Sequence, residues 1–333
     1  MQTHEREIML DLVRVTEAAA LQASRYMGNG DKEQVDGAAV EAMRDMLRTV
    51  NIRGTVVIGE GEKDHAPMLY IGESIGNGDS SYEVDIAVDP VEGTRLVANG
   101  LPNALSILIL AAKGAVRPIP AFYMEKIVVG SEARDRIDLD APVRENLKVV
   151  AASLGKRVTD MTVSILDRPR HQPLIEEIRR VGARIRLITD GDVAAGIAAC
   201  MEGTGVDMLM GIGGATEGVL TAAAVKCLGG EIQARIWPRD PEERQSILKH
   251  MEERDLATIY TADDLAKGDS LIFAATGVTD GDLLKGVRYY GGHATTSSLV
   301  MRMSTGTIRK IETVHNIQRK SDLYQRTRAW RAV

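Results

Sequence analysis

The chain has 333 residues, of which 44% are hydrophobic and 26% charged, and its formal net charge is -6. This composition predicts a globular protein with a substantial core. The negative charge argues against nucleic-acid binding, which normally needs a basic face. No signal-peptide core and no apolar run of membrane-spanning length is present, so we expect a cytoplasmic protein that binds no membrane. Cys200 and Cys227 lie in apolar, helix-like segments, which favours buried thiols over a disulfide framework.

The first part of the chain predicts two helices followed by strands. Apolar residues recur at helical spacing over residues 4–27, and Gly28 and Gly30 then end the helix. A second helix is expected over about 33–50. Strand-like runs follow at 53–59, 82–88 and 105–112. Acidic loops come directly after the first two of these runs.

The second part alternates strands and helices, which is typical of parallel βαβ units. Strands are expected at 162–166, 184–188 and 206–210, and helices at 173–181, 193–201 and 219–228. Because ligands of parallel sheets bind at the carboxyl ends of the strands, the candidate binding loops are 167–170, 190–192 and 211–217. No linker rich in Pro, Ser or Gly separates domains.

Carboxylates gather around the second acidic loop. Asp89 closes the apolar strand, Pro90 is expected to stop it, and Gly93 permits a tight turn that brings Asp89 and Glu92 together. Thr94 adds a hydroxyl group. Each acid alone is more simply a solvated loop residue, but the group as a whole predicts a site for Mg²⁺ or Mn²⁺, which prefer oxygen ligands.

The segment Asp89-Pro90-Val91-Glu92-Gly93-Thr94, with Gly59-Glu60-Gly61-Glu62 before it, resembles the metal-binding signature of the lithium-sensitive phosphatase superfamily. Its form with Glu92 resembles class II (GlpX-type) fructose-1,6-bisphosphatases. Further segments follow in that family's order: Gly30-Asp31-Lys32, Asp36-Gly37-Ala38-Ala39, Tyr123-Met124-Glu125-Lys126, Arg168-Pro169-Arg170-His171, Asp190-Gly191-Asp192 and Gly211–Gly218.

The resemblance implies a layered αβαβα sugar-phosphatase fold with two sheets between helical layers. It implies a single unit, 1–333, of two closely packed halves: a metal-binding half at about 1–140 and a sugar-phosphate-binding half at 141–333. The implied activity is hydrolysis of fructose 1,6-bisphosphate to fructose 6-phosphate and phosphate, in gluconeogenesis. A homo-oligomer, dimer or tetramer, is also implied.

The resemblance also assigns roles to single residues. Two Mn²⁺ or Mg²⁺ ions would be held by Asp36, Glu60, Asp89, Glu92 and Glu217. Catalysis would involve Thr94, Glu217 and Lys32. The substrate would contact Glu92, Gly93, Thr94, Tyr123, Arg168, Pro169, Arg170, Asp190, Gly191, Asp192 and Gly214. Thr94 would orient the attacking water with help from Glu217 or a metal ion, since an alcohol is too weak a base alone.

Several alternatives remain at this point. Taken alone, Arg168-Pro169-Arg170 favours a pair of solvated surface arginines, and 190–192 fits equally well an N-cap with acids in the first helical turn. The glycines of 211–218 lack the register of a dinucleotide loop. The enzyme alternatives are an inositol monophosphatase-like activity and a bifunctional fructose-1,6-/sedoheptulose-1,7-bisphosphatase, the latter weakly opposed by the short connection 76–81. A noncatalytic sugar-phosphate sensor is the different-class alternative. Structural roles are expected for His171 and His293.

Overall fold

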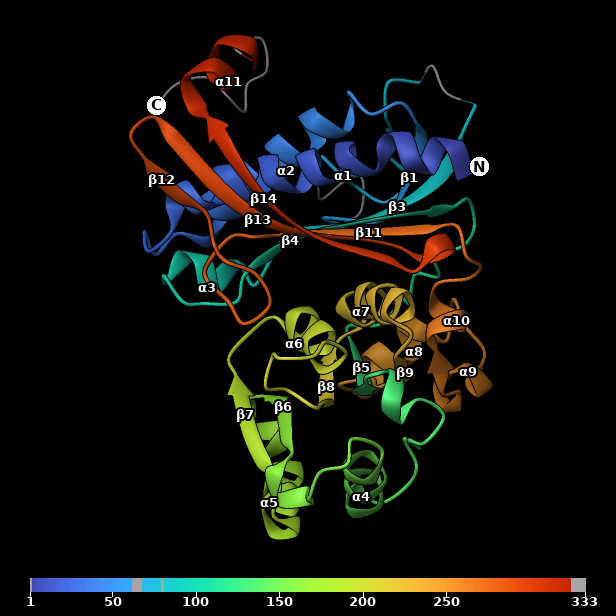
Figure 1. Cartoon of the computed structure of the whole chain (residues 1–333). Helices are drawn as coiled ribbons and strands as arrows, with labels where there is room; N and C mark the ends of the chain where they lie inside the picture. The colour runs from blue at the N-terminus through green and yellow to red at the C-terminus, as the bar shows by residue number, and fades with distance from the viewer. Residues whose placement is uncertain (1, 62–67, 79–80, 325–333) are drawn as a thin grey trace. The chain divides into compact units, whose positions relative to one another are not determined.

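The computed structural model describes residues 2–61, 68–78 and 81–324 (Figure 1). The chain forms two compact units, one of residues 1–116 with 268–333 and one of residues 117–267. The expected α/β class with two sheets is confirmed, because each unit contains one mixed sheet. The division differs from the approximate boundary near residue 140, since the last segment of the chain adds its strands to the first unit's sheet.

In the described part of the first unit, eight strands form a sheet in the order β12-β13-β11-β4-β3-β1-β2, with β14 paired to β13. Only β1 and β3 pair in parallel; the other pairs are antiparallel. The strands are β1 (Arg53–Ile58), β2 (Ser74–Ile75), β3 (Glu83–Glu92), β4 (Leu105–Ala112), β11 (Leu271–Gly277), β12 (Arg288–Tyr290), β13 (His293–Arg302) and β14 (Thr307–Asn316).

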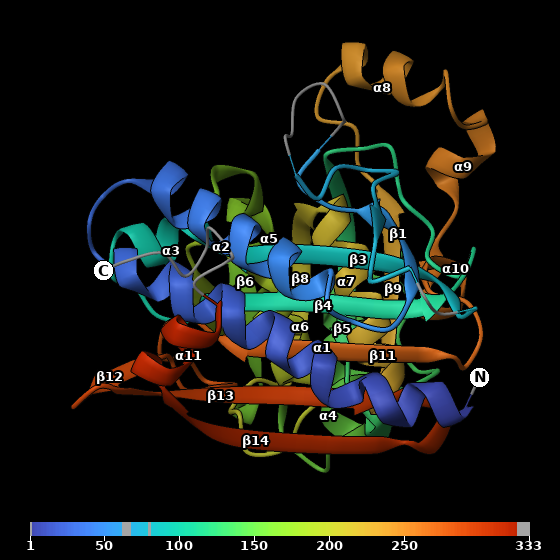
Figure 2. The same ribbon diagram turned by 90° about the horizontal axis from the view of Figure 1, so that it is seen from above.

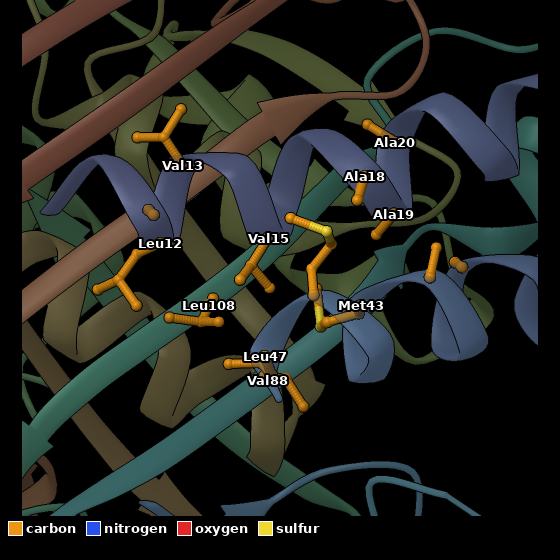
Figure 3. Packing of buried hydrophobic residues seen from close by; sticks show 14 of the residues in the cluster. Leu12, Val13, Val15, Ala18, Ala19, Ala20, Met43, Leu47, Val88 and Leu108 are labelled. Carbon is orange, nitrogen blue, oxygen red and sulfur yellow. The ribbon is translucent and has the colours of Figure 1, made fainter. Parts of the chain in front are cut away.

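Two helices, α1 (Gln2–Ala23) and α2 (Lys32–Leu47), lie across one face of this sheet (Figure 2). The Asp31 side chain accepts hydrogen bonds from the N–H groups of Glu33 and Gln34 and so caps the start of α2. Figure 3 shows the core below the helices, where Leu12 and Met43 are fully buried near Leu108 of β4. Both helices predicted from the apolar spacing are present.

The third strand differs from the prediction. Pro90 does not end β3, which continues to Glu92. The pairing with β4 shifts register between Asp89 and Glu92, where it resumes opposite Leu105. A proline, which lacks an N–H donor, is tolerated in a strand at such a bulge. The turn expected at Gly93 is confirmed by its φ of +84°, and α3 (Thr94–Ala98) follows at once.

In the described part of the second unit, six strands form a sheet in the order β10-β9-β5-β8-β6-β7. The predicted parallel pairs are confirmed, since β6 pairs in parallel with both β7 and β8. Strands β5, β9 and β10 add antiparallel pairs that the alternation did not predict. The strands are β5 (Tyr123–Val129), β6 (Thr162–Leu166), β7 (Arg184–Ile188), β8 (Met208–Gly214), β9 (Glu231–Ile236) and β10 (Tyr260–Thr261).

Helices cover both faces of the second sheet. Ile127 and Val129 of β5 pack in a cluster with α4 (Val143–Ser153) and α5 (Gln172–Val181). Lys126, which precedes Ile127, instead contacts α6 (Asp192–Ala199) and lies against α7 (Ala215–Leu228). The remaining helices are η1 (Ser24–Tyr26), η2 (Ser131–Ala133), η3 (Val158–Asp160), η4 (Pro169–His171), α8 (Pro241–Ile247), α9 (Glu253–Ala257), α10 (Ala262–Leu265), η5 (Met303–Thr305) and α11 (Ile317–Tyr324).

The described helices include none that combines the length and apolar character needed to cross a bilayer. Both cysteines are free thiols, as expected, and Cys227 is buried. Cys200 as a whole is half-buried, but its thiol donates a hydrogen bond to the Val129 carbonyl at 3.2 Å, and burial raises the pKa of this thiol. Burial raises the pKa of the Cys227 thiol to about 12.

Candidate active site

Two of the predicted metal ligands meet in the first unit. Asp36 lies on α2 and Glu60 follows β1, and their carboxyl groups are hydrogen-bonded to each other. Burial, the charge of Asp36 and this hydrogen bond raise the pKa of Glu60 to about 7. Burial and the charge of Glu33 raise the pKa of Asp36 as well. Two carboxylates this close repel each other when ionised, so they hold a proton or require a cation.

Close backbone packing fixes the position of Glu60. Its N–H donates to the Leu69 carbonyl at 3.0 Å. A Cβ atom on the preceding Gly59 would lie 2.0 Å from that same carbonyl oxygen, so the loop requires glycine there. Glu62, which belongs to the resemblance, lies outside the described residues, as do residues 79–80 of the short connection 76–81.

The end of β3 carries the other two predicted ligands of this unit. Glu92 is buried and Asp89 half-buried, on either side of the bulge. Thr94 begins α3, and its hydroxyl donates to the Val91 carbonyl at 3.0 Å. With its proton used in this way, the Thr94 oxygen keeps lone pairs that can accept a hydrogen bond from water.

Two of the five predicted ligands meet within one unit. In residues 2–61, 68–78 and 81–324, no group of three or more acidic, histidine or cysteine side chains comes together in a way that could hold a metal ion. The structure brings Asp36 and Glu60 together, whereas Glu217 belongs to the second unit. Lys32 starts α2 one turn before Asp36, and its exposed amine lies 3.2 Å from Glu33.

In the second unit, the carboxyl ends of the parallel strands meet, as predicted. Arg170 donates from Nε and Nη2 to the Ile212 carbonyl of β8, at 3.2 and 2.7 Å. Arg168 lies 3.6 Å from Asp190, which follows β7. Both arginines are half-buried. Both guanidinium groups thus have partners at this edge of the sheet, which favours a fixed position over free solvation.

His171 completes this arrangement. The Ile212 N–H donates to Nε2 at 2.7 Å, which leaves the proton on Nδ1, 2.7 Å from the Leu166 carbonyl. The ring thus joins the end of β6 to β8 beyond the point where their backbone pairing stops. Burial lowers the pKa of His171 and favours this neutral form. The structural role predicted for His171 is confirmed. His293 is half-buried beside Gly291 and Tyr290.

Tyr123 supports the same arginine from the neighbouring strand. The Arg170 guanidinium lies over the Tyr123 ring, 4.7 Å from its centroid. The ring of Trp237 meets Tyr123 edge-on at 6.2 Å. A cation over an aromatic face is attracted to the ring electrons. Tyr123 and the Ile212 carbonyl therefore hold the Arg170 side chain in one position.

A buried cation and two acids gather around Gly213 and Gly214. The Lys126 amine lies 2.6 Å from Asp192 and donates to the Gly214 carbonyl at 3.1 Å. A Cβ atom on Gly213 would lie 1.8 Å from the Asp192 carboxylate, and one on Gly214 would lie 1.7 Å from the Glu217 carboxylate. Burial and Asp192 raise the pKa of Glu217, whereas Lys126 lowers it. A side chain at either position would therefore have to displace the neighbouring carboxylate.

Sequence reasoning assigned no role to Lys126, which is 1% exposed. The available signal was a lysine among the apolar residues of β5, because a buried ammonium requires a partner. One further expectation is corrected. Residues 211–214 form the end of β8 rather than a loop, since they pair with β5. The alternative that 190–192 forms the start of a helix is confirmed, because Gly191 is the N-cap of α6 and Asp192 lies in its first turn.

Comparison with known proteins places this geometry in a family. The model of the bacterial, glpX-encoded fructose-1,6-bisphosphatases matches residues 6–315. The chain belongs to this family. A class 2 fructose-1,6-bisphosphatase of Escherichia coli K12 is 47% identical over 326 residues, which cover 95% of this chain and 97% of the relative. Class 2 enzymes of Escherichia coli O6:H1 and Shigella flexneri match with the same identity and coverage.

Membership in the glpX-encoded family confirms the predicted resemblance and the predicted class of enzyme, a fructose-1,6-bisphosphatase. The sensor, inositol-phosphatase and bifunctional alternatives are not favoured. The matched residues include both acidic loops of the first unit and the three strand ends of the second. The match by itself assigns no role to single residues in these segments.

Proposed function

We propose that the chain removes the 1-phosphate of fructose 1,6-bisphosphate with the help of divalent metal ions. The observation that carries the metal requirement is the contact between the carboxyl groups of Asp36 and Glu60. Their oxygen atoms fit a hard cation such as Mg²⁺ or Mn²⁺, which would take the place of the shared proton. Two ions would be held by Asp36, Glu60, Asp89, Glu92 and Glu217.

A bound divalent ion polarises phosphate oxygens and lowers the pKa of a bound water. The protein's own groups would position the reactants. The Thr94 oxygen accepts a hydrogen bond from the attacking water, because its proton is given to the Val91 carbonyl. Gly93, in its left-handed conformation, is the N-cap of α3 and lies between Glu92 and Thr94. Glu217 and Lys32 assist the proton transfer and charge balance at the scissile phosphate.

The second unit would bind the sugar and the 6-phosphate of the substrate. Arg170, fixed by Tyr123 and Ile212, and Arg168 bind the 6-phosphate as cations. The sugar is bound by 190–192. The Oδ1 atom of Asp192 is buried without a hydrogen-bond partner among the described residues, and a sugar hydroxyl would satisfy it. Gly214 contributes a backbone contact. A reducing, cytoplasmic compartment fits the two free thiols.

A panel of substrates tests this function. Release of phosphate is measured with fructose 1,6-bisphosphate, fructose 1-phosphate, sedoheptulose 1,7-bisphosphate and inositol 1-phosphate, in the presence of Mn²⁺. The highest kcat/KM is expected for fructose 1,6-bisphosphate, with fructose 6-phosphate as the sugar product. A product that has lost its 6-phosphate, or a preference for inositol 1-phosphate, contradicts the proposal.

A further inference from the structure

Strand β14 forms one edge of the first unit's sheet. It pairs with β13 along its whole length, Thr307–Asn316. The other side of β13 is occupied by β11 and β12. In the described part of the chain no strand pairs with the far side of β14, which lies outermost beyond β13 (Figure 2). An edge of ten residues presents a row of backbone N–H and C=O groups that another strand can bind.

The side chains of β14 alternate between a covered and an open face. On the covered face, Ile311 packs against the core and Arg309 Nη1 lies 3.4 Å from Met9 Sδ of α1. The open face carries Ile308, Lys310, Glu312 and Val314, all exposed, with Ile308 at 44% and Val314 at 63%. Two apolar residues thus flank a lysine and a glutamate on a surface that faces solvent.

The order of these four residues is self-complementary. We propose that β14 pairs antiparallel with β14 of a second copy of the chain, around a two-fold axis at Ile311. In this register Lys310 lies opposite Glu312 of the second copy, and Ile308 lies opposite Val314. The two-fold axis repeats each pair, so the interface contains two opposite-charge pairs and two apolar pairs. Directly opposite residues of these kinds stabilise antiparallel strands.

The charges also define the register. Lysine on an edge strand usually prevents pairing with other strands, and here a shift of two residues produces that repulsion. One such shift places Lys310 opposite Lys310, and the other places Glu312 opposite Glu312. Only the axis at Ile311 pairs both charges with opposite ones. The two copies would then form one continuous sheet with a defined alignment.

The surroundings of the strand are compatible with this pairing. Lys285 lies 3.3 Å from Glu312, but both side chains are largely exposed, so the carboxylate can accept from a second amine. Val314 also lines a hollow of about 160 Å³ together with Lys285, Thr295 and Thr313. Ile308 of the second copy, placed opposite Val314, would cover the exposed Val314 side chain at the edge of this hollow and remove it from water.

Charge reversal tests the interface by sedimentation velocity. Wild type is expected to assemble, and Glu312→Lys or Lys310→Glu alone should raise the dissociation constant by about tenfold or more, since like charges then face each other twice. The double swap Lys310→Glu/Glu312→Lys should restore assembly to within about threefold. Glu202→Lys, an exposed reversal of the same charge in the second unit, should leave assembly unchanged. A monomeric wild type, or single variants that assemble like wild type, overturns the proposal.

Disulfide crosslinking tests the register. The variant Ile308→Cys/Val314→Cys should form a covalent dimer on oxidation, seen at twice the chain mass on a non-reducing gel. Neither single variant should do so, because equivalent positions of the two copies would lie about 20 Å apart along the strands, beyond the reach of a disulfide. No covalent dimer from the double variant, or equal crosslinking of a single one, contradicts the alignment. Far-UV circular dichroism checks that each variant is folded.

Discussion

The carboxyl groups of Asp36 and Glu60 are hydrogen-bonded to each other, and burial, the charge of Asp36 and this hydrogen bond together raise the pKa of Glu60 to about 7 from an ordinary value of 4.5. The metal-free protein therefore keeps a proton here that the unfolded chain would release. The contribution of this proton to the stability of the folded state is fully present below pH 4.5, and it is lost as the pH rises through about 7. A divalent ion that binds here has to displace it.

Metal affinity should consequently depend on pH. Between about pH 5 and 7, Mn²⁺ binding to wild type should strengthen by up to about tenfold per pH unit, because one proton is released, and it should level off above that range. Glu60→Gln should weaken binding and flatten the dependence. Isothermal titration calorimetry in buffers of different ionisation enthalpy measures both affinity and proton release. Affinity independent of pH in wild type would show that the pair is not the binding site.

Thr94 should act on the rate rather than on binding. Thr94→Ala removes the oxygen that orients the water, so kcat should fall by about 10²-fold, the scale of one lost transition-state contact. The KM and the metal requirement should change little. Thr94→Ser keeps the hydroxyl and should retain most of the activity. Steady-state kinetics with fructose 1,6-bisphosphate decides the matter, and a change confined to KM would make Thr94 a binding residue instead.

Arg170 should distinguish substrates by their second phosphate. Loss of a charge-assisted contact costs about 1.5–3 kcal/mol, so Arg170→Ala should raise the KM for fructose 1,6-bisphosphate about 10- to 100-fold. Fructose 1-phosphate, which lacks the distal group, should be hydrolysed as by wild type. Arg180→Ala, on the exposed side of α5, is the charge-matched control. If both substrates are weakened equally, Arg170 acts elsewhere.

The buried pair Lys126–Asp192 should show strong coupling. Its side chains are 1% and 4% exposed, so Lys126→Met leaves an acid without its cation and should cost about 3–5 kcal/mol of stability. Adding Asp192→Asn removes the orphaned charge and should recover part of that loss. Thermal unfolding of the two single variants and the double variant gives the coupling energy. Strictly additive losses would show that the pair is not coupled in the folded state.

The sequence predicted well those elements whose signal is local. The strands at 105–112, 162–166 and 184–188 match the structure to the residue, because each is rich in β-branched residues or leucine and is bounded by breakers such as glycine, proline or aspartate. Pairing partners depend on tertiary contacts, so the return of β11 to β4 had no local signal. The prediction that Pro90 ends the strand was wrong for a related reason. The bulge that accommodates the proline depends on the pairing with the neighbouring strand β4.

The residues of the candidate site were likewise predictable only where a short segment of sequence carries the signal. Asp36, Glu60 and Arg170 could be named because the resemblance depends on short segments. The contact between Asp36 and Glu60 joins a helix to the end of a strand, and spacing along the chain does not predict it. Lys126 was missed because its partner Asp192 lies 66 residues away in sequence, and only the folded β5 places the amine beside it.

Metal-dependent hydrolysis of the 1-phosphate is the central claim, and phosphate release by metal-stripped enzyme tests it most directly. The enzyme is treated with a chelator, freed of it, and assayed with fructose 1,6-bisphosphate before and after addition of Mn²⁺ or Mg²⁺. The account predicts no turnover without metal and restored release of phosphate, with fructose 6-phosphate as product, once metal is added. Full activity of the stripped enzyme, or fructose 1-phosphate as the product, would contradict it.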